Sequence, residues 1–200
     1  ERVLFRPDGS FATGGNFLPY ERLSSLAPAA DVAALVTENA AAMQETLGEV
    51  VGEAGVDMDG SREHIRSQET NLGDLIADIL RETMGAQVAI TNGGGIRTSI
   101  PAGPVTLGQV YEVLPFDNYV VMLTLTGAQI RQALENGVSE VENGAGRFPQ
   151  VSGLSFRFNP ALPAGERVTE ILVDGRPIDP AAEYTVATND FTAAGGDGYD

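Results

Sequence analysis

The feature that most constrains the fold is a short apolar strand that runs directly into three consecutive glycines and an arginine. The strand is expected over Gln87–Thr91, the glycines are Gly93–Gly95, and Arg97 follows. A glycine-rich turn after a strand lets the backbone approach a ligand closely, because no Cβ is in the way. The guanidinium of Arg97 is a charged fork suited to carboxylate or phosphate. Such glycine clusters are also typical of plain turns, so this stretch alone leaves both interpretations open.

Length and composition indicate one well-packed domain with an appendage. The chain has 200 residues, of which 42% are hydrophobic, enough for a single core. No run of 18 or more apolar residues occurs, so no membrane-spanning helix is expected. The chain does not begin with methionine, and it stops in a glycine-rich stretch. We therefore expect a piece of a longer protein, in which a signal peptide or anchor would not be visible.

The residue types that are missing exclude several classes of catalyst. There is no cysteine and no lysine, and His64 is the single histidine. These absences exclude thiol nucleophiles, a Walker-type lysine, a Schiff base and a multi-histidine metal centre within this chain. The net charge of −16 argues against nucleic-acid binding through a basic face. We expect the reactive groups of any difficult chemistry to lie outside this chain.

Hydrophobic periodicity predicts helices that alternate with strands. A long amphipathic helix is expected from an Asp31 cap to about Gly52, then a strand at residues 55–58. A second helix begins at Thr70 or Asn71, and its expected core side chains are Leu72, Leu75, Ile76, Ile79 and Leu80. Further helices are expected after Thr106 and Thr126, and strands at residues 119–125, 150–158, 167–173 and 184–188. This order predicts an α+β fold: a single mixed-sheet domain with flanking helices, preceded by a linker helix.

Two arginines precede the second of these helices. Arg62 and Arg66 lie close to its amino terminus, where free N–H groups and the helix dipole favour anions. Alternatively, they are surface arginines that pair with Glu63 and Glu69. The nearby Asp57–Gly60 run does not make an EF-hand, because the loop position that requires glycine is occupied by Arg62.

Four separated pieces of the chain together resemble a known family. They are Arg66-Ser-Gln-Glu-Thr-Asn-Leu-Gly, Thr91-Asn-Gly-Gly-Gly-Ile-Arg97, Leu114-Pro-Phe-Asp-Asn118 and Asp190-Phe-Thr-Ala-Ala-Gly-Gly-Asp-Gly-Tyr199. In this order they resemble the carboxy-terminal domain of the 5′-nucleotidase family, which includes bacterial UDP-sugar hydrolases and ecto-5′-nucleotidases. The resemblance covers about residues 31 to 200.

The resemblance implies a domain organisation. Residues 1–30 would be the tail of a missing amino-terminal metallophosphatase domain, residues 31–52 the interdomain linker helix, and residues 53–200 the nucleotide-binding domain. Members of the family hold two divalent metal ions in the amino-terminal domain, and this chain lacks that domain's motifs. It is therefore expected to bind no metal or cofactor itself, to contain no catalytic residue and to be inactive alone. Its expected partners are a nucleotide or nucleoside and its own amino-terminal domain, with no nucleic acid.

The family's binding residues transfer by motif position. Arg66 and Arg97 would bind the substrate phosphate, with Arg62 as a third cation, and Phe116 and Phe191 would sandwich the base. The remaining expected substrate-binding residues are Asn92, Gly94, Gly95, Asn118, Gly153 and Asp197. On sequence alone, a phenylalanine after proline is typical of a core and an aspartate between glycines is typical of a turn. We expect no catalytic role for His64.

The function that the resemblance implies is substrate recognition in a 5′-nucleotidase-type phosphohydrolase that converts nucleoside phosphates to nucleoside and phosphate. Two alternatives remain open. The domain could be a non-catalytic nucleotide-binding module, or part of a related hydrolase acting on cyclic nucleotides, UDP-sugars, NAD or thiosulfonate esters. The family implies a periplasmic, secreted or cell-surface location. The sequence gives neither the preferred base nor the metal.

Overall fold

The computed structural model describes residues 2–5, 7–8, 10–14 and 26–200. The chain divides into two units, Glu1–Gln44 and Glu45–Asp200. In the first, β1 (Arg2–Phe5) and β2 (Phe11–Gly14) form an antiparallel hairpin. The long helix α2 spans Ala30–Leu47.

The helix α2 differs from its prediction at both ends. It begins at Ala30, so Asp31 lies in its first turn instead of capping it, and it ends at Leu47, not near Gly52. Gly48 follows the last helical residue, and glycine is the residue that most often terminates a helix. The β-branched residues beyond it belong to a strand, β3 (Val50–Ala54), which pairs antiparallel with β5 (Gly103–Thr106). The strand expected at residues 55–58 is reduced to an isolated bridge between Met58 and Ile100.

A four-stranded mixed sheet forms the centre of the second unit. Its strand order is β6 (Val120–Thr126), β11 (Glu183–Asn189), β4 (Val88–Asn92) and β7 (Pro149–Ser152). The strands β11 and β4 are parallel, and the two outer pairs are antiparallel. The mixed α+β class is confirmed, although the strands are divided among several sheets.

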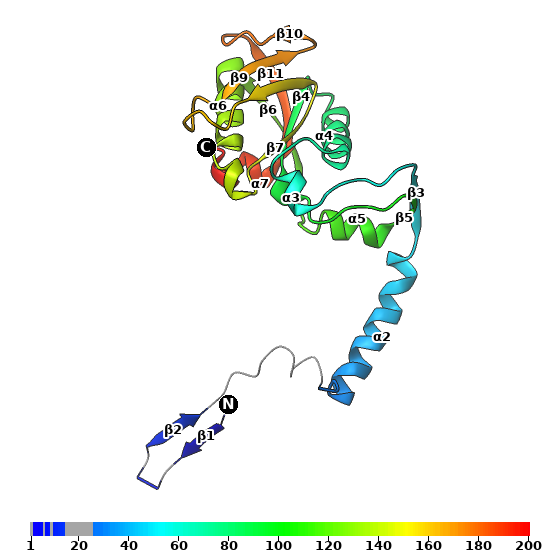
Figure 1. Ribbon diagram of the computed structural model, residues 1–200. Helices are drawn as coiled ribbons and strands as arrows, with labels where there is room; N and C mark the ends of the chain where they lie inside the picture. Colours follow the sequence, from blue (N-terminus) through cyan, green and yellow to red (C-terminus); the bar gives the residue numbers. More distant parts are fainter. Residues whose placement is uncertain (1, 6, 9, 15–25) are drawn as a thin grey trace. The chain divides into compact units, whose positions relative to one another are not determined.

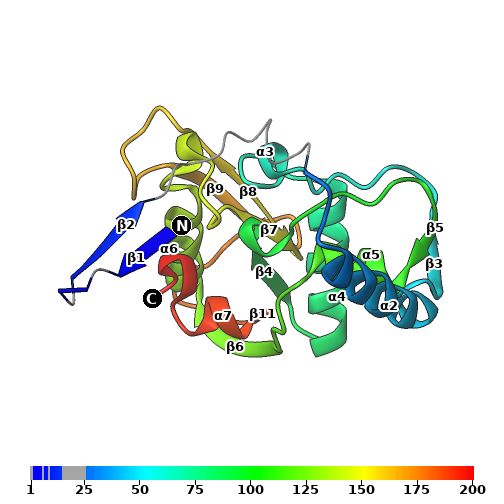
Figure 2. The ribbon, with the colours of Figure 1, turned by 90° about the horizontal axis from the view of Figure 1, so that it is seen from below.

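Two helices cover opposite faces of this sheet (Figures 1 and 2). They are α4 (Asn71–Met84) and α6 (Gly127–Val138). As expected, the Thr70 hydroxyl caps α4 by accepting from the N–H of Gly73, and Thr126 caps α6 in a capping box with Gln129. A shorter helix, α5 (Leu107–Val113), has the same kind of box at Thr106.

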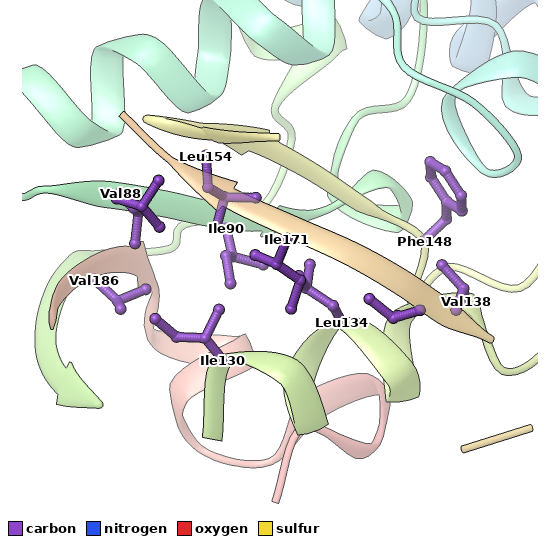
Figure 3. Close-up of a cluster of buried hydrophobic side chains, with 11 residues drawn as sticks. Val88, Ile90, Ile130, Leu134, Val138, Phe148, Leu154, Ile171 and Val186 are labelled. Atoms are coloured by element: carbon purple, nitrogen blue, oxygen red, sulfur yellow. The ribbon is translucent and has the colours of Figure 1, made fainter. Parts of the chain in front are cut away.

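The core side chains of α6 lie on one face of the helix. Ile130, Leu134 and Val138 are fully buried and belong to one cluster with Val88 and Val186 of the sheet (Figure 3). On α4 the prediction was partly wrong. Its buried side chains include Leu72 and Ile76, while Leu75 and Ile79 are exposed. The other buried positions of α4 are occupied by small residues, Gly73 and Ala77, so the buried face of the helix carries few large side chains.

The strand predicted over residues 150–158 is two strands in two sheets. At Gly153 the chain leaves β7 and enters β8 (Leu154–Phe158), which pairs with β9 (Val168–Val173). The short strand β10 (Arg176–Pro177) completes this three-stranded sheet. Gly153 has φ of 71°, a left-handed conformation that glycine adopts at no steric cost.

Candidate functional site

The glycine run that follows β4 is packed against other backbone segments. Gly93–Gly95 form a 3₁₀ turn, η1. A Cβ on Gly93 would lie 2.1 Å from the carbonyl oxygen of Ile65, and one on Gly94 would lie 2.8 Å from the Cα of Gly146. A Cβ on Gly95 would meet only the side chain of Asn92, at 3.4 Å. Two of the glycines are thus required by close backbone packing, and the third faces open space.

That open space is a cavity of about 270 Å³. Its walls come from segments far apart in the sequence, and they combine two arginines, two phenylalanines, two asparagines, an aspartate and three glycines. The lining residues are Arg66, Asn92, Gly94, Gly95, Arg97, Phe116, Asn118, Gly146, Phe191 and Asp197.

The arginines give the cavity a positive wall. Arg66 is only 8% exposed; one guanidinium N–H donates to the carbonyl of Gly144 at 3.2 Å. Its Nε is buried and has no hydrogen-bond partner among the described residues. Burial and the charges of Arg62 and Arg97 lower the pKa of Arg66, against the opposing charge of Asp197. A buried guanidinium N–H that has no partner and lies close to other positive charges is suited to donate a hydrogen bond to an anion.

The two aromatic side chains are unusually exposed for phenylalanine. Phe116 is 53% and Phe191 is 45% exposed, so Phe116 is not the core side chain that its position after a proline also allowed. Phe116 lies between α5 and β6, and Phe191 belongs to the short helix α7 (Asp190–Ala193). The guanidinium carbon of Arg97 lies 5.8 Å from the ring centroid of Phe116, within cation–π range.

The carboxylate of Asp197 is held in place by a hydrogen bond from the side chain of Asn92. Asn92 is 3% exposed, and its amide donates to Asp197 Oδ2 at 2.8 Å. Its own Oδ1 accepts from Asn189 at 3.1 Å and from the hydroxyl of Thr192 at 3.4 Å. Asp197 has φ of 55°, uncommon for a residue other than glycine. The Asn92 amide is thus engaged within the protein, and it orients the Asp197 carboxylate at the cavity wall.

The structure brings most of the expected site residues together. Nine of them line this cavity; Arg62 and Gly153 do not. Arg62 begins the short helix α3 (Arg62–Ile65), of which Arg66 is the C-cap. Gly153 has a different structural role, since a Cβ there would lie 2.2 Å from the carbonyl oxygen of Gln87. The expectation that Gly153 contacts a ligand stays a prediction, and the structure gives Gly153 no place in the wall of this cavity.

Sequence reasoning missed some residues of the site. Gly146 lines the cavity, and Asn189 and Thr192 support Asn92. The Gly144–Gly146 stretch carries only an ordinary turn signal. Asn189 could have been found as a polar residue at the end of β11, beside the end of β4.

A larger cavity, about 450 Å³, lies between α6 and the end of the chain. Its walls are mainly apolar and amide side chains, including Leu125, Gln132 and Val186, and they contain no arginine. Size alone favours this cavity, but charge and exposed aromatic rings favour the smaller one. We regard the smaller cavity as the candidate site because its chemistry is specific.

The described part of the chain offers neither a metal site nor a membrane span of its own. It contains no group of three or more histidine, cysteine, aspartate or glutamate side chains placed to hold a metal ion. None of its helices combines the length and the apolar character needed to cross a bilayer.

Comparison with known proteins gives consistent results. The family model described as 5′-nucleotidase, C-terminal domain, matches residues 50–200. The trifunctional nucleotide phosphoesterase protein YfkN of Bacillus subtilis (strain 168) is 48% identical over 166 residues, which are 78% of this chain and 11% of that protein. Protein UshA of Escherichia coli (strain K12) is 36% identical over 149 residues, covering 74% of this chain and 26% of UshA.

Solved structures agree with the sequence matches. A 5′-nucleotidase precursor from Thermus thermophilus aligns with a TM-score of 0.81 and 46% identity, over 84% of this chain and 35% of that one. The NAD nucleotidase of Haemophilus influenzae aligns with a TM-score of 0.65 and 26% identity, over 98% of this chain and 40% of that one. The chain thus spans well under half of each of these relatives.

Proposed function

The chain belongs to the 5′-nucleotidase C-terminal domain family, and from this premise we propose that it recognises a nucleoside phosphate. Arg66 and Arg97, with Arg62 beside them, bind the phosphate. Phe116 and Phe191 hold the base between them. Asp197, oriented by Asn92, accepts hydrogen bonds from the ribose hydroxyls, and Asn118 contacts the base.

One observation supports this proposal most directly. The buried guanidinium of Arg66, one N–H of which has no partner, and the half-exposed rings of Phe116 and Phe191 line the same cavity. Guanidinium groups bind phosphate through paired, charge-assisted hydrogen bonds. Stacking of a base on an aromatic ring contributes about 1–3 kcal/mol. A ligand with an anionic end and a flat apolar end satisfies both walls, and a nucleoside phosphate has both.

We further propose that the whole protein is a 5′-nucleotidase-type phosphohydrolase and that this chain alone is inactive. The chain's own contribution is to hold the base and ribose so that the phosphate is oriented for attack. Two divalent metal ions, expected in a separate amino-terminal metallophosphatase domain, supply an activated water when bound there. The named relatives that are phosphoesterases or nucleotidases support this proposal.

The proposed location is periplasmic, secreted or at the cell surface. The proposal follows from membership of the family; no helix among the described residues could cross a bilayer. Fractionation of cells that express the full-length protein tests it. Recovery of the protein in the cytosolic fraction would contradict this part of the proposal.

The binding role is tested by calorimetric titration of this chain with AMP, adenosine and UDP-glucose. We expect AMP to bind more tightly than adenosine, because only AMP reaches the arginines. Phe191→Ala should weaken both AMP and adenosine by about 5- to 150-fold, the equivalent of 1–3 kcal/mol. The matched control is Tyr111→Ala, since Tyr111 is an exposed aromatic residue of α5 that does not line the cavity.

The outcomes separate the competing functions. Equal losses from Phe191→Ala and Tyr111→Ala, or no binding of any ligand, would overturn the nucleotide site. If the chain binds a nucleotide and the upstream part of the full-length protein lacks metal ligands, a non-catalytic binding module is favoured over a hydrolase. Turnover of AMP by the purified chain, free of contaminating phosphatase, would contradict the assignment of catalysis to another domain.

A further inference from the structure

The one-turn helix α3 carries two of the site's arginines. Arg62 is its first residue and Arg66 its C-cap. Between them, Ile65 is fully buried, and its carbonyl lies against Gly93 of the glycine turn. A four-residue helix has little stability of its own, so the position of both guanidinium groups depends on what holds α3 in place.

Asp59 holds this helix at both ends. Its Oδ1 accepts from the backbone N–H of Ser61, the N-cap residue, at 2.9 Å. Its Oδ2 lies 2.5 Å from Nδ1 of His64, which is in the last turn. The Ser61 side chain makes no capping hydrogen bond. The Asp59 carboxylate instead connects the N-cap residue to the last turn of the helix, through the Ser61 N–H and the His64 ring.

Asp59 is itself fixed to the elements around the cavity. Its N–H donates to Asn71 Oδ1, the first residue of α4, at 2.8 Å. The next residue, Gly60, donates to the Ser99 hydroxyl at 2.9 Å, and Ser99 follows shortly after Arg97. The Asp59 loop thus connects the helix that carries Arg62 and Arg66 to the segment that carries Arg97.

The electrostatics of this pair respond to pH. The hydrogen bond that His64 donates to the Asp59 carboxylate, and the charge of that carboxylate, raise the pKa of His64. Hydrogen bonds from Ser61 and His64 lower the pKa of Asp59 to about 2. The charged side chains on the segments around His64 are Asp57 and Asp59 on the preceding loop, Arg62, Glu63 and Arg66 on or next to α3, and Glu69 before α4.

We propose that Asp59 and His64 are positioning residues for the arginines of the site, and that anion binding there follows the protonation state of His64. Protonated His64 forms an ion pair with Asp59, which holds α3 more firmly and adds a positive charge beside the cluster. Deprotonation makes the imidazole neutral and leaves only its hydrogen bond with the Asp59 carboxylate. Anion affinity is therefore highest below the pKa of His64 and falls as the pH rises through it. This inference rests on the proposed function.

The probe must not change its own charge with pH. Adenosine 5′-sulfate keeps a constant charge near neutrality, whereas the phosphate of AMP titrates there. Its affinity for the chain is measured by calorimetry at about pH 5.5 and about pH 8.5, either side of the range in which histidine titrates. Adenosine, which has no anionic group, is titrated in parallel. The wild-type chain should bind the sulfate about two- to fivefold more tightly at the lower pH, the size expected for partly exposed charges.

Three variants complete the test. His64→Gln should remove the pH dependence, and Asp59→Asn should weaken sulfate binding at both pH values while leaving adenosine almost unchanged. The matched control is Glu170→Gln, which removes the exposed Arg157–Glu170 ion pair of the three-stranded sheet and should preserve the pH dependence. Thermal unfolding of each variant confirms that it is folded.

The outcomes are distinguishable from failure of the proposed function. If the affinity for adenosine 5′-sulfate depended equally on pH in the wild type and in His64→Gln, the role of His64 would be overturned while the nucleotide site would stand. The same would follow if the affinity for adenosine depended on pH as strongly as the affinity for the sulfate. An equal loss of adenosine and sulfate binding in Asp59→Asn would reduce the pair to a general structural role. Absence of binding by both ligands at either pH would overturn the nucleotide site and this inference with it.

Discussion

A single buried amide, Asn92, determines how the Asp197 carboxylate is presented to the cavity. It ends β4, donates to Asp197 and accepts from Asn189. A buried polar side chain of this kind is costly unless every group finds a partner. The residue that precedes the glycine turn therefore contributes to the site indirectly, through the carboxylate that it orients.

The motif residues of the site could be predicted from the sequence because each lies in a short, well-marked stretch. The structure brings Arg66, Arg97, Phe116 and Phe191 to one cavity. Supporting residues could not be predicted in this way. Gly146 approaches Gly94 only through tertiary packing, at positions that are 52 residues apart in the numbering.

Gly153 was expected in the site because of its place in a motif, and the structure shows in addition that the backbone geometry requires glycine there. Gly153→Ala should destabilise the chain by about 2 kcal/mol or more, because a left-handed φ and a backbone clash combine there. The nearest atom would be the Gln87 carbonyl oxygen at 2.2 Å. Urea unfolding measures the loss, and nucleotide affinity of the folded fraction should be unchanged.

The matched control is Gly165→Ala. Gly165 also has a left-handed φ, 91°, but a Cβ there would meet no atom within 4 Å. Gly165→Ala should lower the free energy of unfolding by only about 1 kcal/mol, which is the conformational penalty of a left-handed φ alone. Equal costs at Gly153 and Gly165 would show that the contact with Gln87 is not a real constraint.

Asp74, in the first turn of α4, gives the stability of the chain a pH dependence. Burial, with the charge of Glu69 and a hydrogen bond to it, raises the pKa of Asp74 to about 6. In the unfolded chain the pKa of Asp74 is about 3.9. At pH values between about 3.9 and about 6, Asp74 therefore carries a proton more often in the folded state than in the unfolded state. The contribution of Asp74 to stability therefore falls as the pH rises through this window.

Asp74→Asn tests this sign. The variant keeps the shape of the side chain and removes the charge, so it should be more stable than the wild type at about pH 7.5 and closer to it at about pH 4. Thermal unfolding at the two pH values measures the difference. A variant that is less stable than the wild type at the higher pH would show that the Asp74 charge is favourable, as its place at a helix amino terminus would otherwise suggest.

At the scale of elements, strongly periodic segments were predictable and their ends were not. The strand β4 and the helices α4 and α6 were expected from buried runs, caps and apolar spacing, and the structure confirms them. The end of α2 was missed because the valines beyond Leu47 continue the same apolar pattern inside a strand. A local pattern does not state which partner buries an apolar side chain.

The helix α6 is fixed at its carboxyl end by an arginine that sequence reasoning did not single out. Arg167 donates to the carbonyls of Val138 and Ser139, at 2.6 and 3.0 Å, and forms a two-point pair with Glu142 at 2.8 and 3.0 Å. Its side chain is 7% exposed. These contacts satisfy helix carbonyls that otherwise have no partner.

Arg167→Met should therefore destabilise the chain by about 2–4 kcal/mol, since buried carbonyls and Glu142 lose their donor. The control is Arg157→Met, because the side chain of Arg157 is 82% exposed in its pair with Glu170 and should contribute less than about 1 kcal/mol. Chemical denaturation measures both. Similar losses in the two variants would contradict the capping role.

At the scale of the whole molecule, the chain is strongly acidic, yet Arg66 and Arg97 lie together in the wall of one cavity, and the charge of Arg62 acts on Arg66. A net charge of −16 supports solubility and makes a three-arginine cluster a local exception. An anionic ligand that binds there does so because of short-range contacts, against the sign of the molecule's overall charge. The proposed recognition of a phosphate would therefore depend on the segments that hold these arginines in place, which are the glycine turn and α3.

Among the residues that the structure describes, the buried clusters lie within the second unit. Every residue of the buried clusters has a number above 53, and the family match begins at residue 50. The contacts divide at Gln44. Stability in a domain comes mainly from burial in its own core, so residues 45–200 should fold and bind without those before them.

A shortened chain that begins at Glu45 tests this expectation. Its unfolding midpoint should lie within about 2 °C of that of the 200-residue chain, a change well under 1 kcal/mol, and its AMP affinity should be the same within about twofold. Differential scanning calorimetry and titration measure the two quantities. A lower midpoint with unchanged affinity would show that the first unit stabilises the domain, whereas weaker AMP binding at an unchanged midpoint would show that it contributes to the site.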